Sequence, residues 1–148
     1  MITTMLGKTF RWWESGWYDD EAETFTPEPW RFEPVRMGVD HIEYTLAEGP
    51  HAGRQAIQRI YYQRVAPNVE LTTWCEESGS VLTITWYLDS QTTHRIAVIP
   101  AWLVRNLREI YAGNNQDPDF QKRLRDAADS GSDHPRKIIS DTGYFELL

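Results

Sequence analysis

The chain has 148 residues and a net charge of −7, with 15 Lys and Arg against 22 Asp and Glu. An acidic chain without a basic run is poorly suited to nucleic acid, because phosphate contacts need clustered Lys and Arg. Apolar residues make up 41%, enough for a packed core, and no apolar run reaches the roughly 18–20 residues of a membrane span. No secretory signal pattern is present, so we expect a single cytoplasmic domain over residues 1–148 that binds neither nucleic acid nor membrane.

The first part of the chain combines a short strand with a segment rich in acidic residues and proline. Residues 8–13 are the first predicted strand. Residues 19–38 contain Pro27, Pro29 and Pro34, and proline interrupts regular hydrogen bonding. We therefore expect a loop or covering flap over residues 19–38.

The middle of the chain is a succession of short strands. Apolar and polar residues alternate in runs that end at Gly, Pro or Asn, which is typical of an antiparallel meander. The predicted strands cover residues 41–46, 54–65, 69–76, 81–88 and 94–99.

The last third predicts two helices and a closing strand. Pro100 suits a first helical turn, and apolar residues then recur at helical spacing up to Tyr111. Asp117 and Pro118 are an N-cap and a first-turn proline for a second, short helix. Residues 137–148 are the closing strand.

Seven or eight strands in a chain of this size must protect their sheet edges, and closure into a barrel removes the edges. An eight-stranded barrel is wide enough to hold one small ligand. The many Trp and Tyr side chains could line such a cavity or could fill a solid core. The sequence leaves both possibilities open.

Few motifs of known chemistry are present. The four histidines do not stand at metal-ligand spacings, and the chain has neither a Gly-x-Ser-x-Gly motif nor a glycine-rich phosphate loop. No metal site is therefore predicted, and Cys75, inside a predicted strand, is expected to be a buried inert thiol.

Three charged residues lie within apolar or aromatic segments, namely Arg11, Arg54 and Glu76. Inside a barrel, a carboxylate beside Trp74 could move a proton, and an arginine facing it could hold a substrate carboxylate. The alternative for each is an exposed strand end or a salt bridge at the rim.

Four segments resemble motifs of the phenolic acid decarboxylase family, in order and largely in spacing. They are Trp13-Glu14-Ser15-Gly16-Trp17, the stretch from Tyr44 to Arg54 that ends His51-Ala52-Gly53-Arg54, Thr73-Trp74-Cys75-Glu76-Glu77-Ser78-Gly79, and Val98-Ile99-Pro100-Ala101-Trp102-Leu103-Val104. The resemblance implies a mainly β, lipocalin-like (calycin-type) antiparallel barrel with a central cavity and short C-terminal helices. It also implies a homodimer without metal or organic cofactor. Members of the family decarboxylate p-hydroxycinnamic acids through a quinone methide.

The resemblance also implies site residues. Arg54 and Glu76 match the arginine and glutamate of the family and are the expected catalytic residues, whereas Arg11 and Trp13 replace its two tyrosines. Because alternate residues of a strand project to one side, we expect Arg11 and Trp13 to point together into the cavity. The expected substrate-binding residues are Arg11, Trp13, Trp74, Tyr44, Ile84 and Trp86.

Three functions remain open at this point. The first is a cofactor-independent decarboxylase of a small aromatic or conjugated carboxylic acid, with Arg54 and Arg11 orienting the carboxylate and Glu76 moving a proton. The second is an isomerase, hydratase or cyclase of specialised metabolism that uses the same cavity. The third is a non-catalytic barrel that binds a small anionic ligand.

Overall fold

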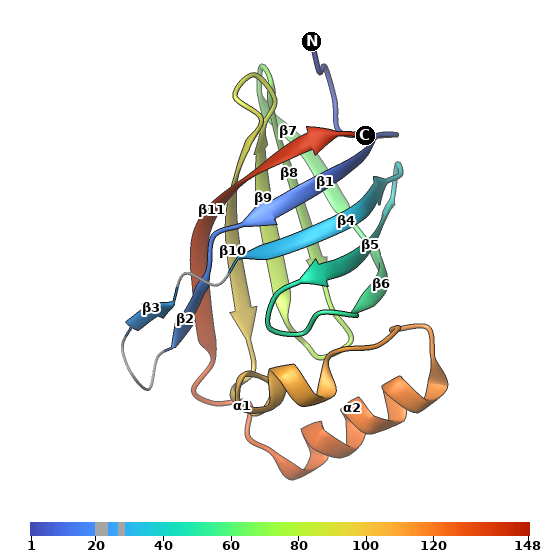
Figure 1. Cartoon of the computed structure of the whole chain (residues 1–148), viewed down its shortest axis with the longest axis vertical. Helices are drawn as coiled ribbons and strands as arrows, with labels where there is room; N and C mark the ends of the chain where they lie inside the picture. Colours follow the sequence, from blue (N-terminus) through green and yellow to red (C-terminus); the bar gives the residue numbers. More distant parts are fainter. Residues whose placement is uncertain (20–23, 27–28) are drawn as a thin grey trace.

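The computed structural model describes residues 1–19, 24–26 and 29–148. In this part of the chain, nine strands form one antiparallel sheet in the order β6-β5-β4-β1-β11-β10-β9-β8-β7 (Figure 1). The strands of this sheet are β1 (Thr9–Glu14), β4 (Trp30–Met37), β5 (His41–Glu48), β6 (Gln55–Arg59), β7 (Tyr61–Ala66), β8 (Val69–Cys75), β9 (Val81–Tyr87), β10 (Thr92–Ile99) and β11 (Lys137–Leu147). Two short strands, β2 (Trp17–Asp19) and β3 (Thr24–Thr26), pair with each other outside it.

The sheet closes on itself through the segment predicted as one long strand, residues 54–65. This segment is divided at Ile60 into β6, which pairs with β5, and β7, which pairs with β8. The two edge strands of the sheet are therefore consecutive in the chain, and β6 also contacts β8. The expected antiparallel barrel is confirmed.

The expectation of a loop or flap over residues 19–38 is wrong for its second half. Residues 30–37 form β4, which lies between β1 and β5 in the barrel wall. The register of β4 against β5 shifts between Phe32 and Val35, so Pro34 stands at an irregularity where its missing N–H does not break a regular ladder. Residues 20–23 and 27–28 lie outside the described residues.

Both predicted helices are present. Helix α1 (Ala101–Ile110) begins directly after Pro100, and α2 (Pro118–Ser130) is capped by Asp117, whose side chain accepts a hydrogen bond from the amide of Asp119. Figure 1 shows α1 and α2 together at one end of the barrel, with both chain termini towards the other end. None of the described helices is long and apolar enough to cross a membrane.

The barrel interior has two unlike halves. Phe10, Trp86 and Phe145 pack edge to face, with ring centroids 5.3 to 6.1 Å apart, and fill the interior away from the helices. Towards the helices the packing opens into a pocket, to which α1 contributes Leu103 and Leu107. A solid aromatic core and a cavity thus occupy different parts of one barrel.

Candidate active site

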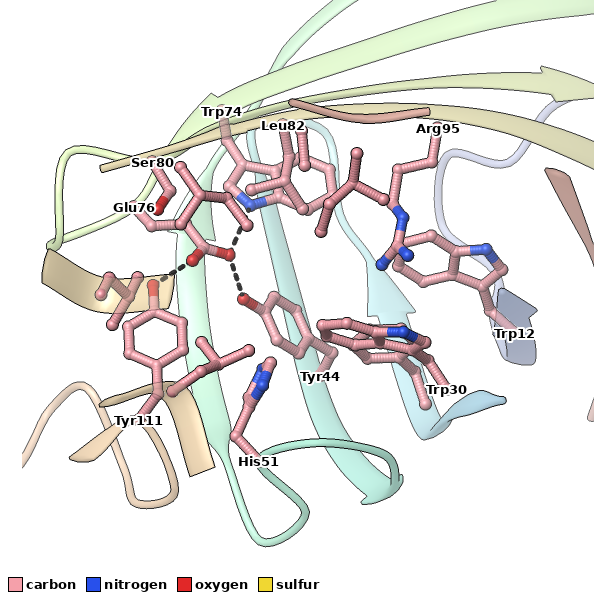
Figure 2. A pocket seen from close by; sticks show the side chains of 16 residues that line it. Trp12, Trp30, Tyr44, His51, Trp74, Glu76, Ser80, Leu82, Arg95 and Tyr111 are labelled. Carbon is pink, nitrogen blue, oxygen red and sulfur yellow. Dashed lines mark hydrogen bonds between the residues drawn. The ribbon is translucent and has the colours of Figure 1, made fainter. Parts of the chain in front are cut away.

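The pocket is a narrow cavity of about 30 Å³ inside the barrel, at the end that α1 covers. Its wall is mostly aromatic and aliphatic. The polar or ionisable residues in the wall are Tyr44, His51, Glu76, Ser80, Arg95 and Tyr111 (Figure 2).

Glu76 points into the pocket because of the alternation of β8 and the turn that follows it. Thr72, Trp74 and Glu76 are the buried residues in this stretch, so they share the inner face. The amide of Glu76 donates to the carbonyl of Ser80 over 2.8 Å, which closes the turn. Gly79 in this turn has φ +86°, a conformation that a side chain would disfavour.

Arg54 is placed behind Glu76 by a second tight turn. Gly53 has φ +96° and donates to the carbonyl of Leu46, which brings Arg54 into the barrel at the start of β6. The Arg54 side chain is 1% exposed and is not part of the pocket wall. Arg54 contacts Tyr44, Tyr111 and Glu76, which line the pocket, and affects the site through these residues.

Two tyrosines hydrogen-bond the carboxyl group of Glu76 (Figure 2). The Tyr44 hydroxyl donates to Oε1 over 2.8 Å, and the Tyr111 hydroxyl donates to Oε2. The indole N–H of Trp74 also points to Oε1, at 3.4 Å. Accepting on both oxygens is the behaviour of an ionised carboxylate.

Arg54 completes this group, called here the Glu76 cluster: Tyr44, Arg54, Glu76, Glu77 and Tyr111. Its Nη1 donates to Oε1 of Glu77 over 2.6 Å, and its Nη2 lies 3.5 Å from Oε2 of Glu76. Its guanidinium carbon lies 3.8 Å from the centroid of the Tyr111 ring, a cation–π contact.

Burial and charge set the protonation of the Glu76 cluster. Burial raises the pKa of Tyr44 and of Tyr111 well above the usual tyrosine value, so both phenols stay neutral donors. For Glu77, burial pushes the pKa upward, but the charge and hydrogen bond of Arg54 prevail and hold the pKa below its usual value. Burial likewise opposes the charge of Arg54, but the oxygens around it outweigh burial and raise its pKa.

A second buried arginine contributes to the pocket wall. Arg95 lies opposite Asp141 in the pairing of β10 with β11. Its Nε and Nη2 donate to the two carboxylate oxygens of Asp141 over 2.8 and 2.7 Å, a bidentate pair. Its guanidinium carbon lies 4.5 Å from the centroid of the Trp30 ring. Figure 2 shows the Arg95 side chain beside Trp12 and Trp30, on the other side of the pocket from Glu76.

Glu14 lies next to this arginine but is not bonded to it. Its Oε1 accepts from the indole N–H of Trp12 over 2.6 Å and from the hydroxyl of Thr93 over 2.8 Å. Burial raises the pKa of Glu14 to about 7, against the opposing charge of Arg95. Arg95, Asp141, Glu14, Trp12 and Thr93 are called here the Arg95 cluster.

The inward orientation expected for Arg11 and Trp13 is wrong. In β1 the buried residues are Phe10, Trp12 and Glu14, so Arg11 and Trp13 project from the outer face. Arg11 is 36% exposed and binds Glu33 over 2.8 Å. Trp13 pairs with Tyr144 of β11 and stacks on its ring at 4.4 Å. Both side chains find partners outside the barrel, and the pocket receives Trp12 instead.

Of the other expected substrate-binding residues, Tyr44 and Trp74 line the pocket. Ile84 and Trp86 are buried, but they belong to the packed half of the interior and not to the pocket wall. Cys75, expected to be a buried thiol, is exposed at the end of β8, because it alternates with the inward Trp74 and Glu76.

Sequence reasoning missed the site residues His51, Arg95, Tyr111 and Glu14. Arg95 could have been found, since it shares the inner face of β10 with Ala97 and Ile99. Tyr111 follows the last residue of α1 and gave no signal beyond a helical apolar pattern. Among the described residues, no three His, Cys, Asp or Glu side chains are grouped so as to hold a metal ion.

Comparisons with known proteins agree with this barrel fold. A crystal structure from Burkholderia vietnamiensis described as a "putative beta-lactamase" superposes with a TM-score of 0.58 at 12% identity, over 97% of this chain and 95% of that one, which shows a shared fold. A "Probable phenolic acid decarboxylase" of Vibrio cholerae serotype O1 is 25% identical over 111 residues, which are 74% of this chain and 62% of the Vibrio protein. The sequence model of the family described as phenolic acid decarboxylase (PAD) matches residues 24–147. The chain belongs to the phenolic acid decarboxylase family.

Proposed function

We propose that the protein is a cofactor-independent decarboxylase of an aromatic or conjugated carboxylic acid. The observation that carries this proposal is the Glu76 carboxylate at the wall of an apolar pocket, bonded on both oxygens by the neutral phenols of Tyr44 and Tyr111. Family membership, shown by the match over residues 24–147, supports the reaction type.

The proposed role of Glu76 is to accept the proton of a substrate hydroxyl. When the phenol of a p-hydroxycinnamate loses its proton to Glu76, the electron pair moves through the ring to the alkene. The carbon that bears the carboxylate then takes up a proton from solvent water. In the resulting quinone methide the bond to the carboxylate breaks, carbon dioxide leaves, and the electrons return to the ring. The phenolate oxygen regains the proton from Glu76, so the sum is the carboxylate form of the substrate plus one proton from solvent giving the vinylphenol plus carbon dioxide.

Arg54 is proposed to act through Glu76 rather than on the substrate. It is fully buried behind the wall and held by Glu77 and the ring of Tyr111. Its charge stabilises the Glu76 carboxylate, which would otherwise be costly in an apolar pocket. We therefore treat Arg54 as a positioning residue.

The test is turnover of hydroxycinnamic, indole-acrylic and related conjugated acids, followed by absorbance and released carbon dioxide. Glu76→Gln keeps the shape of the side chain but removes the base, so we expect turnover to fall by about 10²–10⁴-fold. Glu43→Gln, the same substitution at an exposed residue of β5, is the matched control and should leave turnover unchanged. Full activity of Glu76→Gln would remove the proposed role.

Two other results would point to the alternative functions. Conversion of an acid without release of carbon dioxide would indicate an isomerase, hydratase or cyclase. Tight binding without any product would indicate a ligand-binding barrel. Which acid is the substrate, a homodimeric state, a cytoplasmic location and independence of cofactors stay predictions.

A further inference from the structure

The Arg95 cluster is a second charged centre in the same pocket, and the proposed chemistry at Glu76 does not use it. Arg95 is 2% exposed yet contributes to the pocket wall. A buried guanidinium must be paired, and Asp141 supplies one bidentate partner. The question is what the remaining donors of this arginine bind.

The hydrogen bonds of Arg95 leave one edge of the guanidinium available. Nε and Nη2 donate to Asp141, and Nη2 also reaches the carbonyl of Gly16 at 3.3 Å. Nη1 makes no hydrogen bond to the described part of the chain. A planar guanidinium with a free nitrogen at a pocket wall is suited to an anionic oxygen.

The charges of the two clusters favour an anion on the Arg95 side. The Glu76 cluster combines one arginine with Glu76 and Glu77, so its net charge is negative when both are ionised. The Arg95 cluster combines one arginine with Asp141, and its other carboxyl group, Glu14, is neutral below about pH 7. An incoming carboxylate is repelled by the first cluster and meets a neutral assembly with an open guanidinium edge at the second.

We propose that Arg95 binds the carboxylate of an aromatic acid, so that the aromatic ring lies in the pocket and the opposite end of the ligand faces Glu76. For the reacting substrate this inference rests on the proposed function. As a statement about binding it applies to any aromatic acid of suitable size. It assigns to Arg95 the role that the sequence suggested for Arg54 and Arg11.

A proton on Glu14 accompanies this binding. The charged groups that face Glu14 are Arg95 on β10 and Asp141 on β11, while Thr93 and Trp12 donate hydrogen bonds and β4 presents the uncharged Trp30. A ligand carboxylate adds negative charge near Glu14 and favours its protonated form. Affinity for the acid should therefore fall severalfold between about pH 6 and about pH 8, as Glu14 loses its proton.

The experiment measures binding of 3-(4-hydroxyphenyl)propionate and of its neutral amide, by calorimetry or quenching of tryptophan fluorescence. The saturated acid lacks the alkene that the proposed reaction needs, so binding is measured without turnover. The double variant Arg95→Gln/Asp141→Asn removes both charges of the pair and leaves no single buried ion. We expect its affinity for the acid to fall by at least about tenfold, while its affinity for the amide is unchanged.

A matched double variant is available on the outer face of the barrel. Arg11→Gln/Glu33→Gln also removes an arginine–carboxylate pair, and it should bind both probes as the native protein does. Equal affinity of the native protein for acid and amide, absence of acid binding, or full acid affinity in Arg95→Gln/Asp141→Asn would each overturn the inference.

Glu14→Gln provides a second measurement if the first double variant does not fold. It keeps Arg95 and Asp141, so acid binding at about pH 6 should persist while the pH dependence up to about pH 8 disappears. Persistence of that pH dependence would contradict the inference. If the native protein binds the acid as expected but turns over no conjugated acid, the proposed function fails and this inference stands. If the native protein turns over a conjugated acid but binds the acid probe no more tightly than the amide, this inference fails and the proposed function stands.

Discussion

Arg54 and Arg95 are both buried in the same barrel and both lie over an aromatic ring, yet the carboxyl groups beside them respond in opposite ways. Beside Arg54, the pKa of Glu77 is lowered in spite of burial, because Arg54 donates a hydrogen bond of 2.6 Å directly to it. Beside Arg95, burial raises the pKa of Glu14 to about 7, since both bonds to a carboxylate go to Asp141.

The difference shows that closeness to a buried cation is not enough to keep a carboxylate ionised. Glu14 receives hydrogen bonds from Trp12 and Thr93, which are neutral donors. These bonds do not offset the cost of removing the charge from water, and Asp141 adds a repulsive charge. Arg54 and Glu77 therefore keep their charges at neutral pH, whereas Glu14 in the Arg95 cluster can change its charge there.

The largest effect on stability should come from removing Arg54, the buried arginine that faces two carboxylates. Arg54→Met leaves Glu76 and Glu77 without their cation, and breaking a buried pair in this way costs about 3–5 kcal/mol. Arg95→Met leaves only Asp141 ionised when Glu14 is protonated, so its cost should be smaller. Urea unfolding at about pH 6 measures both, and the reverse order would contradict the contrast between the clusters.

The next effect is the pH dependence of stability caused by Glu14. A carboxyl group whose pKa rises on folding, here from 4.5 to about 7, stabilises the fold fully below pH 4.5 and loses that contribution as pH rises to about 7. The loss is about 1.4 kcal/mol per pH unit, or roughly 3 kcal/mol in total. Glu14→Gln should remove this pH dependence. The free energy of unfolding of the variant should therefore rise relative to that of the native protein as pH increases from 4.5 to about 7, as measured by urea unfolding at each pH.

Glu77 should give the opposite result and a smaller effect. Its lowered pKa means that its contribution is present above the unfolded value of 4.5 and is lost as pH falls through the folded value. Glu77→Gln should cost about 1–3 kcal/mol at neutral pH, because a charged hydrogen bond to Arg54 is lost. The difference in free energy of unfolding between Glu77→Gln and the native protein should become smaller at acidic pH. A difference that stays constant at all pH values would exclude the charge of Glu77 as its cause.

The two charged residues Arg54 and Glu76 could be predicted from the sequence because each stands beside a recognisable turn. Arg54 comes directly after the turn from Gly49 to Gly53, and Glu76 starts the turn that contains Ser78 and Gly79. Both residues therefore stand at the end of a strand, within segments that resemble family motifs. Resemblance to a family then placed them in one cavity. Tyr111 was not predicted, since its helical pattern shows burial and not the direction of its hydroxyl.

The Arg95 cluster could not be assembled in the same way. The pairing of Arg95 with Asp141 depends on the register of β10 against β11, which are separated by both helices, and local patterns do not set that register. In β1, each face carries a tryptophan and a charged residue, Trp12 with Glu14 or Trp13 with Arg11. Alternation therefore fits either face, and tertiary contacts with Phe32 and Trp86 decide that Trp12 points inward.

The smallest expected effect is that of Arg11→Gln, and it tests the orientation of β1 directly. Arg11 binds Glu33 at the outer surface, where ion pairs contribute little, so the thermal midpoint should change by less than about 3 °C. Turnover and affinity for aromatic acids should stay at the native level, because the pocket receives Trp12 and not Arg11. If Arg11→Gln instead weakened binding of the acid but not of its amide, Arg11 would have to face the ligand, and β1 would be turned by one residue from the arrangement described. Glu14 would then leave the interior as well, so the same variant checks the Arg95 cluster at the strand that carries it.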